Sequence, residues 1–217
     1  MVSFPTGFDF ISNYGLDRSR RIPGVVEVPG TNEFQRAYRI DRSARLFIPT
    51  RDLFPNGLPQ EFSFVSTFRM LEDTRRERWS LFEVRDRTGR PQFGVTLDGG
   101  TKNVEMFFTN FNGEIERLAF NRRSRRIFNR NWHKIHFSVT RDNVEMYIDC
   151  KPIFSQPLPP RLPVDLDGNI VMATRESDGA TVPADYDDYD EIDPEPPVEA
   201  TTTEKPEIEE VVQCLAS

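Results

Sequence analysis

One predicted β-hairpin, residues 131–150, constrains the fold of this chain more than any other stretch. In both of its halves apolar and polar residues alternate, which is the pattern of strands that bury one face. The polar residues 140–143 supply the turn between the two strands. The apolar positions are Ile135, Phe137 and Val139 in the first strand, then Val144, Met146, Ile148 and Cys150 in the second.

Further strands of similar length and spacing are expected throughout the chain. Phe62, Phe64, Phe68 and Met70 share one face of a long strand, and turn sequences containing glycine separate several of the others. A short helix is expected over residues 8–15, with Thr6 as its cap. Such a pattern predicts an all-β antiparallel sandwich with a short N-terminal helix. The other predicted strands are two short alternating pieces within residues 37–48, followed by 80–85, 92–97, 103–109, 115–120 and 169–174.

The net charge of −7 is distributed unevenly along the chain. Residues 178–210 hold thirteen acidic side chains and one basic one, whereas residues 1–177 carry a net charge of +5. We expect the sandwich body over residues 1–177 and an acidic Pro/Thr-rich insertion over 178–206. The insertion is predicted to be disordered because it cannot bury enough apolar surface to fold. Residues 207–217 are expected to return as the closing strand of the same domain.

Several classes of function are excluded at this level. No run of about 18 apolar residues is present, so no membrane insertion is expected. The first twenty residues do not read as a signal peptide, so the chain is either intracellular or a mature fragment with an added start methionine. His133 and His136 point to opposite faces of one predicted strand and would not share a metal ion. We expect no metal, no cofactor and no enzyme activity.

Basic residues are densest just before the hairpin. Guanidinium groups donate forked hydrogen bonds that suit sulfate and phosphate, so this run predicts a site for heparin or heparan sulfate. The alternatives are a solvated loop or a docking site for the chain's own acidic arm. No aromatic residues interleave to stack on bases, so no nucleic-acid partner is expected. Whether a second group, Arg75, Arg76 and Arg78, joins the run is left open. The predicted site residues are Arg122, Arg123, Arg125, Arg126, Arg130 and Lys134.

Two pairs of residues carry further hypotheses. Cys150 and Cys214 each end a predicted strand, and they form either a disulfide or two buried thiols. A bridge that closes a loop of this length is worth roughly 4 kcal/mol in the chain-entropy model. Tyr186 and Tyr189 are surrounded by acidic residues, which makes them candidate sulfation sites in a secreted protein. The alternative is that they belong to an acidic spacer.

Several segments, taken in their order along residues 1–177 and just beyond, together resemble a known protein family. They are residues 48–64 (IPTRDLFPNGLPQEFSF), 68–70, 79–84, 132–135 (WHKI), 147–150 (YIDC), 164–168 and 173–179. Together they resemble the N-terminal non-collagenous domain of fibril-associated collagens, with types IX and XIX the most similar. The resemblance covers nearly all of residues 8–179. This domain type is thrombospondin N-terminal-like and laminin-G-like.

The resemblance implies a laminin-G-like jelly roll in a secreted extracellular matrix protein without enzyme activity. It also implies a Cys150–Cys214 disulfide and partners that include heparan sulfate and other matrix proteins. Chains of this type would form trimers through a collagenous region outside this chain. Heparin-binding residues are not at fixed positions in the family, so the prediction that the basic run binds heparin rests on its charge alone. The alternative is a stand-alone laminin-G-type lectin or receptor-binding domain. The chain departs from the family in having no second cysteine pair and a long acidic insertion.

Overall fold

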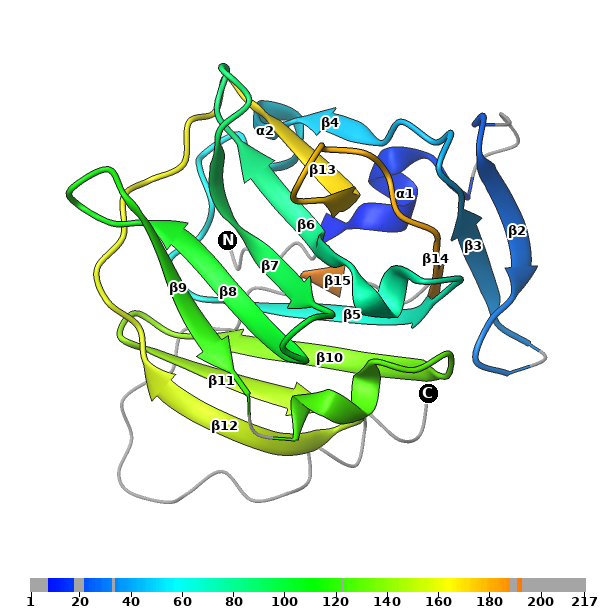
Figure 1. Cartoon of the computed structure of the whole chain (residues 1–217). Helices are drawn as coiled ribbons and strands as arrows, with labels where there is room; N and C mark the ends of the chain where they lie inside the picture. Colours follow the sequence, from blue (N-terminus) through cyan, green and yellow to red (C-terminus); the bar gives the residue numbers. More distant parts are fainter. Residues whose placement is uncertain (1–7, 18–21, 33, 122, 188–190, 193–217) are drawn as a thin grey trace, which may run out of the picture.

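The chain folds into two antiparallel sheets packed face to face (Figure 1). The computed structural model describes residues 8–17, 22–32, 34–121, 123–187 and 191–192. A seven-stranded sheet has the order β12-β11-β10-β5-β14-β3-β2, and a six-stranded sheet has the order β4-β13-β6-β7-β8-β9. The predicted all-β, laminin-G-like jelly-roll sandwich is confirmed.

The strands and helices have these bounds. The seven-stranded sheet contains β2 (Val25–Pro29), β3 (Arg36–Ile40), β5 (Phe62–Met70), β10 (Trp132–Val139), β11 (Asn143–Ile148), β12 (Lys151–Pro157) and β14 (Ala184–Asp187). The six-stranded sheet contains β4 (Phe47–Pro49), β6 (Arg78–Arg85), β7 (Pro91–Asp98), β8 (Asn103–Thr109), β9 (Ile115–Phe120) and β13 (Asn169–Arg175). Outside them lie β1 (Phe8–Asp9), β15 (Glu191–Ile192), the helices α1 (Phe10–Tyr14) and α2 (Thr50–Leu53), and the 3-10 helices η1 (Thr74–Arg76) and η2 (Ser124–Ile127).

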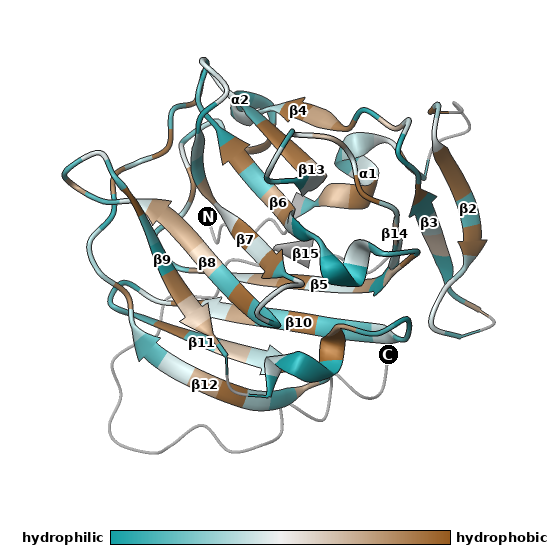
Figure 2. Cartoon of the chain, viewed as in Figure 1, coloured by the Kyte–Doolittle hydropathy of each residue, from teal (hydrophilic) through white to brown (hydrophobic). Residues whose placement is uncertain are grey.

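The predicted hairpin forms as β10 and β11, and every second residue over most of both strands is buried. Figure 2 shows the hydropathy of both strands along the ribbon. Phe137 lies opposite Met146 on β11 and opposite Phe64 on β5. Phenylalanine rings also join the two sheets, because Phe64 and Phe82 lie with their centroids 4.6 Å apart. Aromatic pairs of this kind add to the burial of apolar area that stabilises the sandwich.

The second strand of the hairpin ends earlier than predicted. Asp149 and Cys150 have positive φ angles of 50° and 59°, and the chain turns there directly into β12. Two successive residues with positive φ are the geometry of a two-residue hairpin turn. Cys150 therefore sits in a turn rather than at a strand end, and β12 is a strand that the sequence pattern did not reveal.

The predicted N-terminal helix is confirmed as α1, with a different cap. The Asp9 carboxylate accepts hydrogen bonds from the backbone of Ile11 (2.8 Å), and Gly15 closes the helix with a φ of 70°. Thr6 lies outside the described residues. Phe10 of α1 packs on Phe82 with ring centroids 5.7 Å apart, so the helix fills space between the sheets. No helix in the described part of the chain has the length and apolar character needed to cross a membrane.

Part of the predicted disordered insertion is a central strand. β14 lies between β5 and β3, and its four residues are buried. The Asp185 carboxylate accepts a 2.8 Å hydrogen bond from Arg39 and a 2.5 Å hydrogen bond from Arg69. The prediction of disorder is wrong for residues 184–187, because arginines of the flanking strands neutralise an acid that composition alone treats as repelled. Residues 193–206 and the predicted closing strand 207–217 lie outside the described residues.

The same strand corrects a predicted modification site. Tyr186 is 0% exposed and lies opposite Tyr38 on β3 and Phe68 on β5. A modifying enzyme cannot reach a side chain that is buried in the middle of a sheet. Tyr186 is therefore not a sulfation site in the folded domain, and Tyr189 lies outside the described residues.

Candidate functional site

Both 3-10 helices lie at one end of the sandwich, on either side of the turn between β7 and β8 (Figure 1). The backbone N–H of Gly99 donates to the carbonyl of Glu77 at 2.8 Å, and the Lys102 amine donates to the carbonyl of Arg75 at 2.8 Å. On the other side, the buried Ser124 hydroxyl donates to the carbonyl of Lys102 at 2.8 Å. A single turn therefore holds η1 and η2 in place.

Close contact between η1 and this turn depends on Gly99. A Cβ atom at this position would lie 2.5 Å from the carbonyl carbon of Arg76 and 2.6 Å from the carbonyl oxygen of Glu77. These neighbours are backbone atoms, which cannot rotate away as a side chain can. The absence of a side chain is therefore what allows the close approach.

Basic residues lie on all three segments: Arg75 and Arg76 on η1, Lys102 in the turn, and Arg123 and Arg125 at the start of η2. Figure 2 shows η1 and the first part of η2 as hydrophilic. Burial lowers the pKa of Lys102, and repulsion from Arg75, Arg125 and Arg76 lowers it further. The hydrogen bonds from Lys102 to Arg75 and from Ser124 to Lys102 bring the cations of η1, the turn and η2 close together, in agreement with this direction. We define the basic surface as Arg75, Arg76, Lys102, Arg123, Arg125 and Arg130.

Carboxylates neutralise the basic surface only in part; Asp98 attracts the Lys102 charge. Among the described residues, no ion pair forms with Arg75, Arg123 or Arg125. Arg76 has only a long, exposed pair with Asp73 at 3.7 Å. The Lys102 amine lies 5.1 Å from the centre of the Phe128 ring. The surface therefore keeps a local excess of positive charge that attracts anions.

Only part of the predicted basic run faces solvent in this way. Arg123 and Arg125 are exposed, and Arg130 reaches back to the carbonyl of Glu72 at 3.4 Å. Arg126 instead donates a 2.6 Å hydrogen bond to the carbonyl of Ile148, so it supports the hairpin. Arg122 lies outside the described residues.

Lys134 belongs to a different part of the surface. It lies on β10, whose side chains alternate between core and solvent. The pKa of His136 is lowered by burial and further by the nearby Lys134 charge. Lys134 is thus placed on the outer face of the seven-stranded sheet and not on η2.

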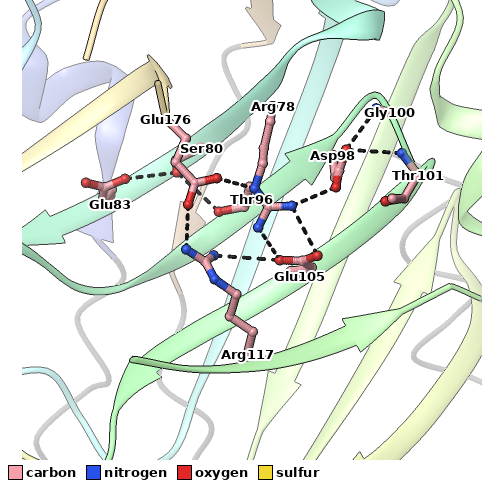
Figure 3. A network of polar contacts seen from close by, with 10 residues as sticks. All are labelled: Arg78, Ser80, Glu83, Thr96, Asp98, Gly100, Thr101, Glu105, Arg117 and Glu176. Carbon is pink, nitrogen blue, oxygen red and sulfur yellow. Dashed lines mark hydrogen bonds and ion pairs between the residues drawn. The ribbon is translucent and has the colours of Figure 1, made fainter. Parts of the chain in front are cut away.

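The second arginine group divides between two roles, and Figure 3 shows the polar network around one of its members, Arg78. Arg78 pairs with Asp98 at 2.7 Å, with Glu105 at 2.5 Å and with Glu176. Hydrogen bonding to Glu105 raises the pKa of Arg78, and Arg117 completes the network by pairing with Glu176 at 2.5 Å. Arg78 is therefore neutralised, whereas the two arginines of η1 join the basic surface.

The turn that carries Cys150 borders this end of the molecule. The Asp149 carboxylate accepts from the backbone N–H of Lys134 at 3.1 Å and contacts the His133 ring nitrogen Nδ1 at 3.1 Å. Burial would raise the pKa of Asp149, but these contacts and the nearby Arg126 lower it. Because Cys214 lies outside the described residues, the disulfide stays a prediction. Within the described ranges, no group of three or more His, Cys, Asp or Glu residues is arranged to hold a metal ion.

Sequence reasoning missed the contribution of Lys102 and did not decide that of η1. Lys102 stands alone in the sequence between two strands, so local charge density gives no signal for it. A paired glycine in the turn before it, Gly99-Gly100, is the one hint that another backbone segment approaches closely.

Comparisons with known proteins find that this chain is similar to part of several collagen chains. It is 38% identical over 141 residues to the human collagen alpha-1(XIX) chain, in an alignment that covers 64% of this chain and 12% of the relative. The human collagen alpha-1(XXI) chain is 31% identical over 75% of this chain and 16% of the relative. The human collagen alpha-1(XVI) chain is 28% identical over 83% of this chain and 11% of the relative. The chain thus spans only a small part of the length of these relatives. No family model matches it.

Solved structures share the fold. The receptor binding domain of botulinum neurotoxin D aligns with a TM-score of 0.56 and 13% identity over 80% of this chain and 43% of that chain. The binding domain of Paraclostridial mosquitocidal protein 1 gives a TM-score of 0.56 and 13% identity over 81% of this chain and 43% of that one. At this identity the likeness concerns the sandwich alone.

Proposed function

Because this chain resembles the non-collagenous domain of fibril-associated collagens, we propose that it is a secreted matrix module whose basic surface binds a sulfated glycosaminoglycan such as heparan sulfate. The relatives are collagen chains, and the module would act as a structural and adhesive part of such a chain and not as an enzyme. Three copies would be joined by a collagenous region outside this sequence. Joining three weak sites raises the overall affinity through effective concentration.

One observation carries the proposal: hydrogen bonds bring the cations of η1, the β7–β8 turn and η2 together, and Arg75, Arg123 and Arg125 form no ion pair with a carboxylate among the described residues. Each arginine can donate two parallel hydrogen bonds to one sulfate group. Cations spread over two helices suit a polymer with several sulfates better than a single small anion. Binding of this kind is screened by salt.

Retention on immobilised heparin tests the proposal. The wild-type domain should elute above physiological salt, and the triple variant Arg75→Gln, Arg123→Gln, Arg125→Gln should elute at much lower salt. A matched control changes Arg87, Arg90 and Arg141, which are exposed elsewhere, to Gln and so removes the same net charge. The control should elute close to the wild type. Equal shifts in both triple variants, or no retention of the wild type, would contradict the proposed site.

The stand-alone lectin or receptor-binding domain is the alternative. The coding sequence downstream of Ser217 distinguishes the two functions. Glycine at every third codon there supports the collagen chain. A continuous globular sequence without such a repeat supports the alternative.

A further inference from the structure

A second candidate site lies at the end of the sandwich opposite the basic surface. There the connection from β12 to β13 crosses beside the turn between β8 and β9 (Figure 1). The backbone N–H of Leu162 donates to the carbonyl of Thr109 at 2.9 Å, and Asn110 and Arg161 form a β-bridge. Four prolines lie between residues 157 and 163 and restrict the backbone of the connection. This wall of the site is therefore largely preformed.

Between the connection and the strands lies a pocket of about 440 Å³. Its size falls in the range of sites that bind ligands. Phe111 and Leu162 line it as well, yet they remain 67% and 37% exposed. Apolar side chains exposed together beside a pocket mark a surface for interaction. Its apolar lining includes Leu58, Phe93, Phe108, Leu158, Pro160 and Val164.

Charged groups at the pocket give it a positive balance. Arg141, Arg161 and Asp142 line it, and neither arginine pairs with a carboxylate in the described part of the chain. The half-buried Arg161 guanidinium donates to the carbonyl of Gln60 at 2.7 Å, and burial lowers its pKa. A partly desolvated cation without a counter-ion is unfavourable, so an anion beside it would be stabilised.

We propose that this pocket binds an extended peptide of a partner protein in which large apolar side chains flank a carboxylate. One apolar side chain would fill the pocket, and the carboxylate would pair with Arg161. A second apolar side chain would cover Phe111 and Leu162. This last requirement favours a peptide over a small amphipathic anion, since a molecule that only fills the pocket leaves those two residues in water. The site shares no residue with the basic surface.

A labelled peptide, Gly-Ser-Phe-Glu-Phe-Ser-Gly, is a direct probe, with fluorescence anisotropy as the readout. The same peptide with Lys in place of Glu should bind more weakly. Phe111→Ser and Arg161→Gln should each weaken binding of the Glu peptide about tenfold, as expected for loss of a central contact. Phe34→Ser and Arg123→Gln are the matched controls and should bind as the wild type does, because Phe34 is 90% exposed in the loop between β2 and β3.

Other results would overturn the proposal. Equal affinity for the Glu and Lys peptides would remove the role of Arg161. Binding that Phe111→Ser leaves intact, or no binding to the wild type, would remove the pocket as the site. Decanoate, an aliphatic carboxylate, should compete only weakly. Displacement of the peptide by decanoate at equal or lower concentration would assign the pocket to a small amphipathic anion instead.

Discussion

The two ends of this sandwich are built from the same strands and yet differ in surface chemistry: one is strongly cationic and the other is mainly apolar. At one end, two 3-10 helices expose arginines around a half-buried lysine. At the other end, a proline-rich connection and the turns between strands enclose an apolar pocket with a single excess positive charge. The strands fix the positions of both ends, and the residues of the connections decide what each end attracts.

The two ends also differ in how they are held. The basic end is positioned by the turn between β7 and β8, where the Lys102 amine donates to the carbonyl of Arg75 and the Ser124 hydroxyl donates to the carbonyl of Lys102. Proline rings and a β-bridge position the pocket end. Binding at the first end should therefore respond to charge and to the geometry of one turn. Binding at the second should respond to shape and apolar area.

Salt should separate the two ends most strongly. Raising sodium chloride from 0.1 to 0.5 M should weaken heparin binding more than about tenfold, because several cations release counter-ions at once. Binding of the Phe-Glu-Phe peptide should change only a few-fold, since most of its contacts are apolar. Titrations at both salt concentrations with the same preparation measure this. Equal sensitivity of the two ligands would remove the distinction between the ends.

Gly99→Ala should damage the basic end while leaving the pocket intact. The new methyl group would contact the backbone of η1 at 2.5–2.7 Å, and overpacking of this kind costs about 1–3 kcal/mol of stability. Urea unfolding and heparin titration should both show a loss, and peptide binding by the folded variant should not. Gly100→Ala is the control, because its Cβ would meet only the Asp98 side chain, at 3.2 Å. Equal losses in both variants would contradict this account of the turn.

Arg125 and Arg126 are neighbours in the sequence and should behave differently. Arg125→Gln should lower heparin affinity with little effect on stability, because its side chain is exposed and unpaired among the described residues. Arg126→Gln should lower stability by about 1 kcal/mol through loss of its bond to Ile148, with a smaller effect on heparin. Thermal unfolding and heparin titration of both variants measure this. An equal loss of heparin affinity in both variants would instead support a single continuous basic run in which Arg125 and Arg126 have the same role.

A small pH effect is expected beside the basic end. The pKa of Asp149 is lowered, so its stabilising contribution is present above the ordinary carboxyl pKa of about 3.9 and is lost as the pH falls through its lower folded value. The stability difference between the wild type and Asp149→Asn should be largest near pH 7 and shrink below about pH 4. Urea unfolding across this range measures it. A difference that grows on acidification would contradict the lowered pKa.

Much of the sandwich is predictable because strands with one buried face carry their own period-two signal. The hairpin of β10 and β11 is the clear example. The phenylalanines of β5 keep the same period, although most residues of that strand are buried. β14 is different, because Asp185 in this strand is stabilised by Arg39 and Arg69, which lie 146 and 116 residues away in the sequence. No local pattern contains that information.

The candidate site shows the same limit. Local charge density found Arg123, Arg125 and Arg130, but it gave equal weight to Arg126, whose role is set by a carbonyl on β11. Lys102 joins the basic surface only because its turn packs between two helices that are distant in sequence. The roles of Arg126 and Lys102 are set by contacts between residues distant in the chain, which a single sequence does not reveal.

The central claim is that η1 and η2 form one binding surface, and a double-mutant cycle tests it most directly. Affinity for a heparin octasaccharide would be measured by calorimetry for the wild type, Arg75→Gln, Arg125→Gln and the double variant. Each single change should weaken binding by a similar factor, and the double change should weaken it further. If Arg125→Gln weakens binding and Arg75→Gln leaves it unchanged, the site is confined to the run around η2 and the composite surface is wrong.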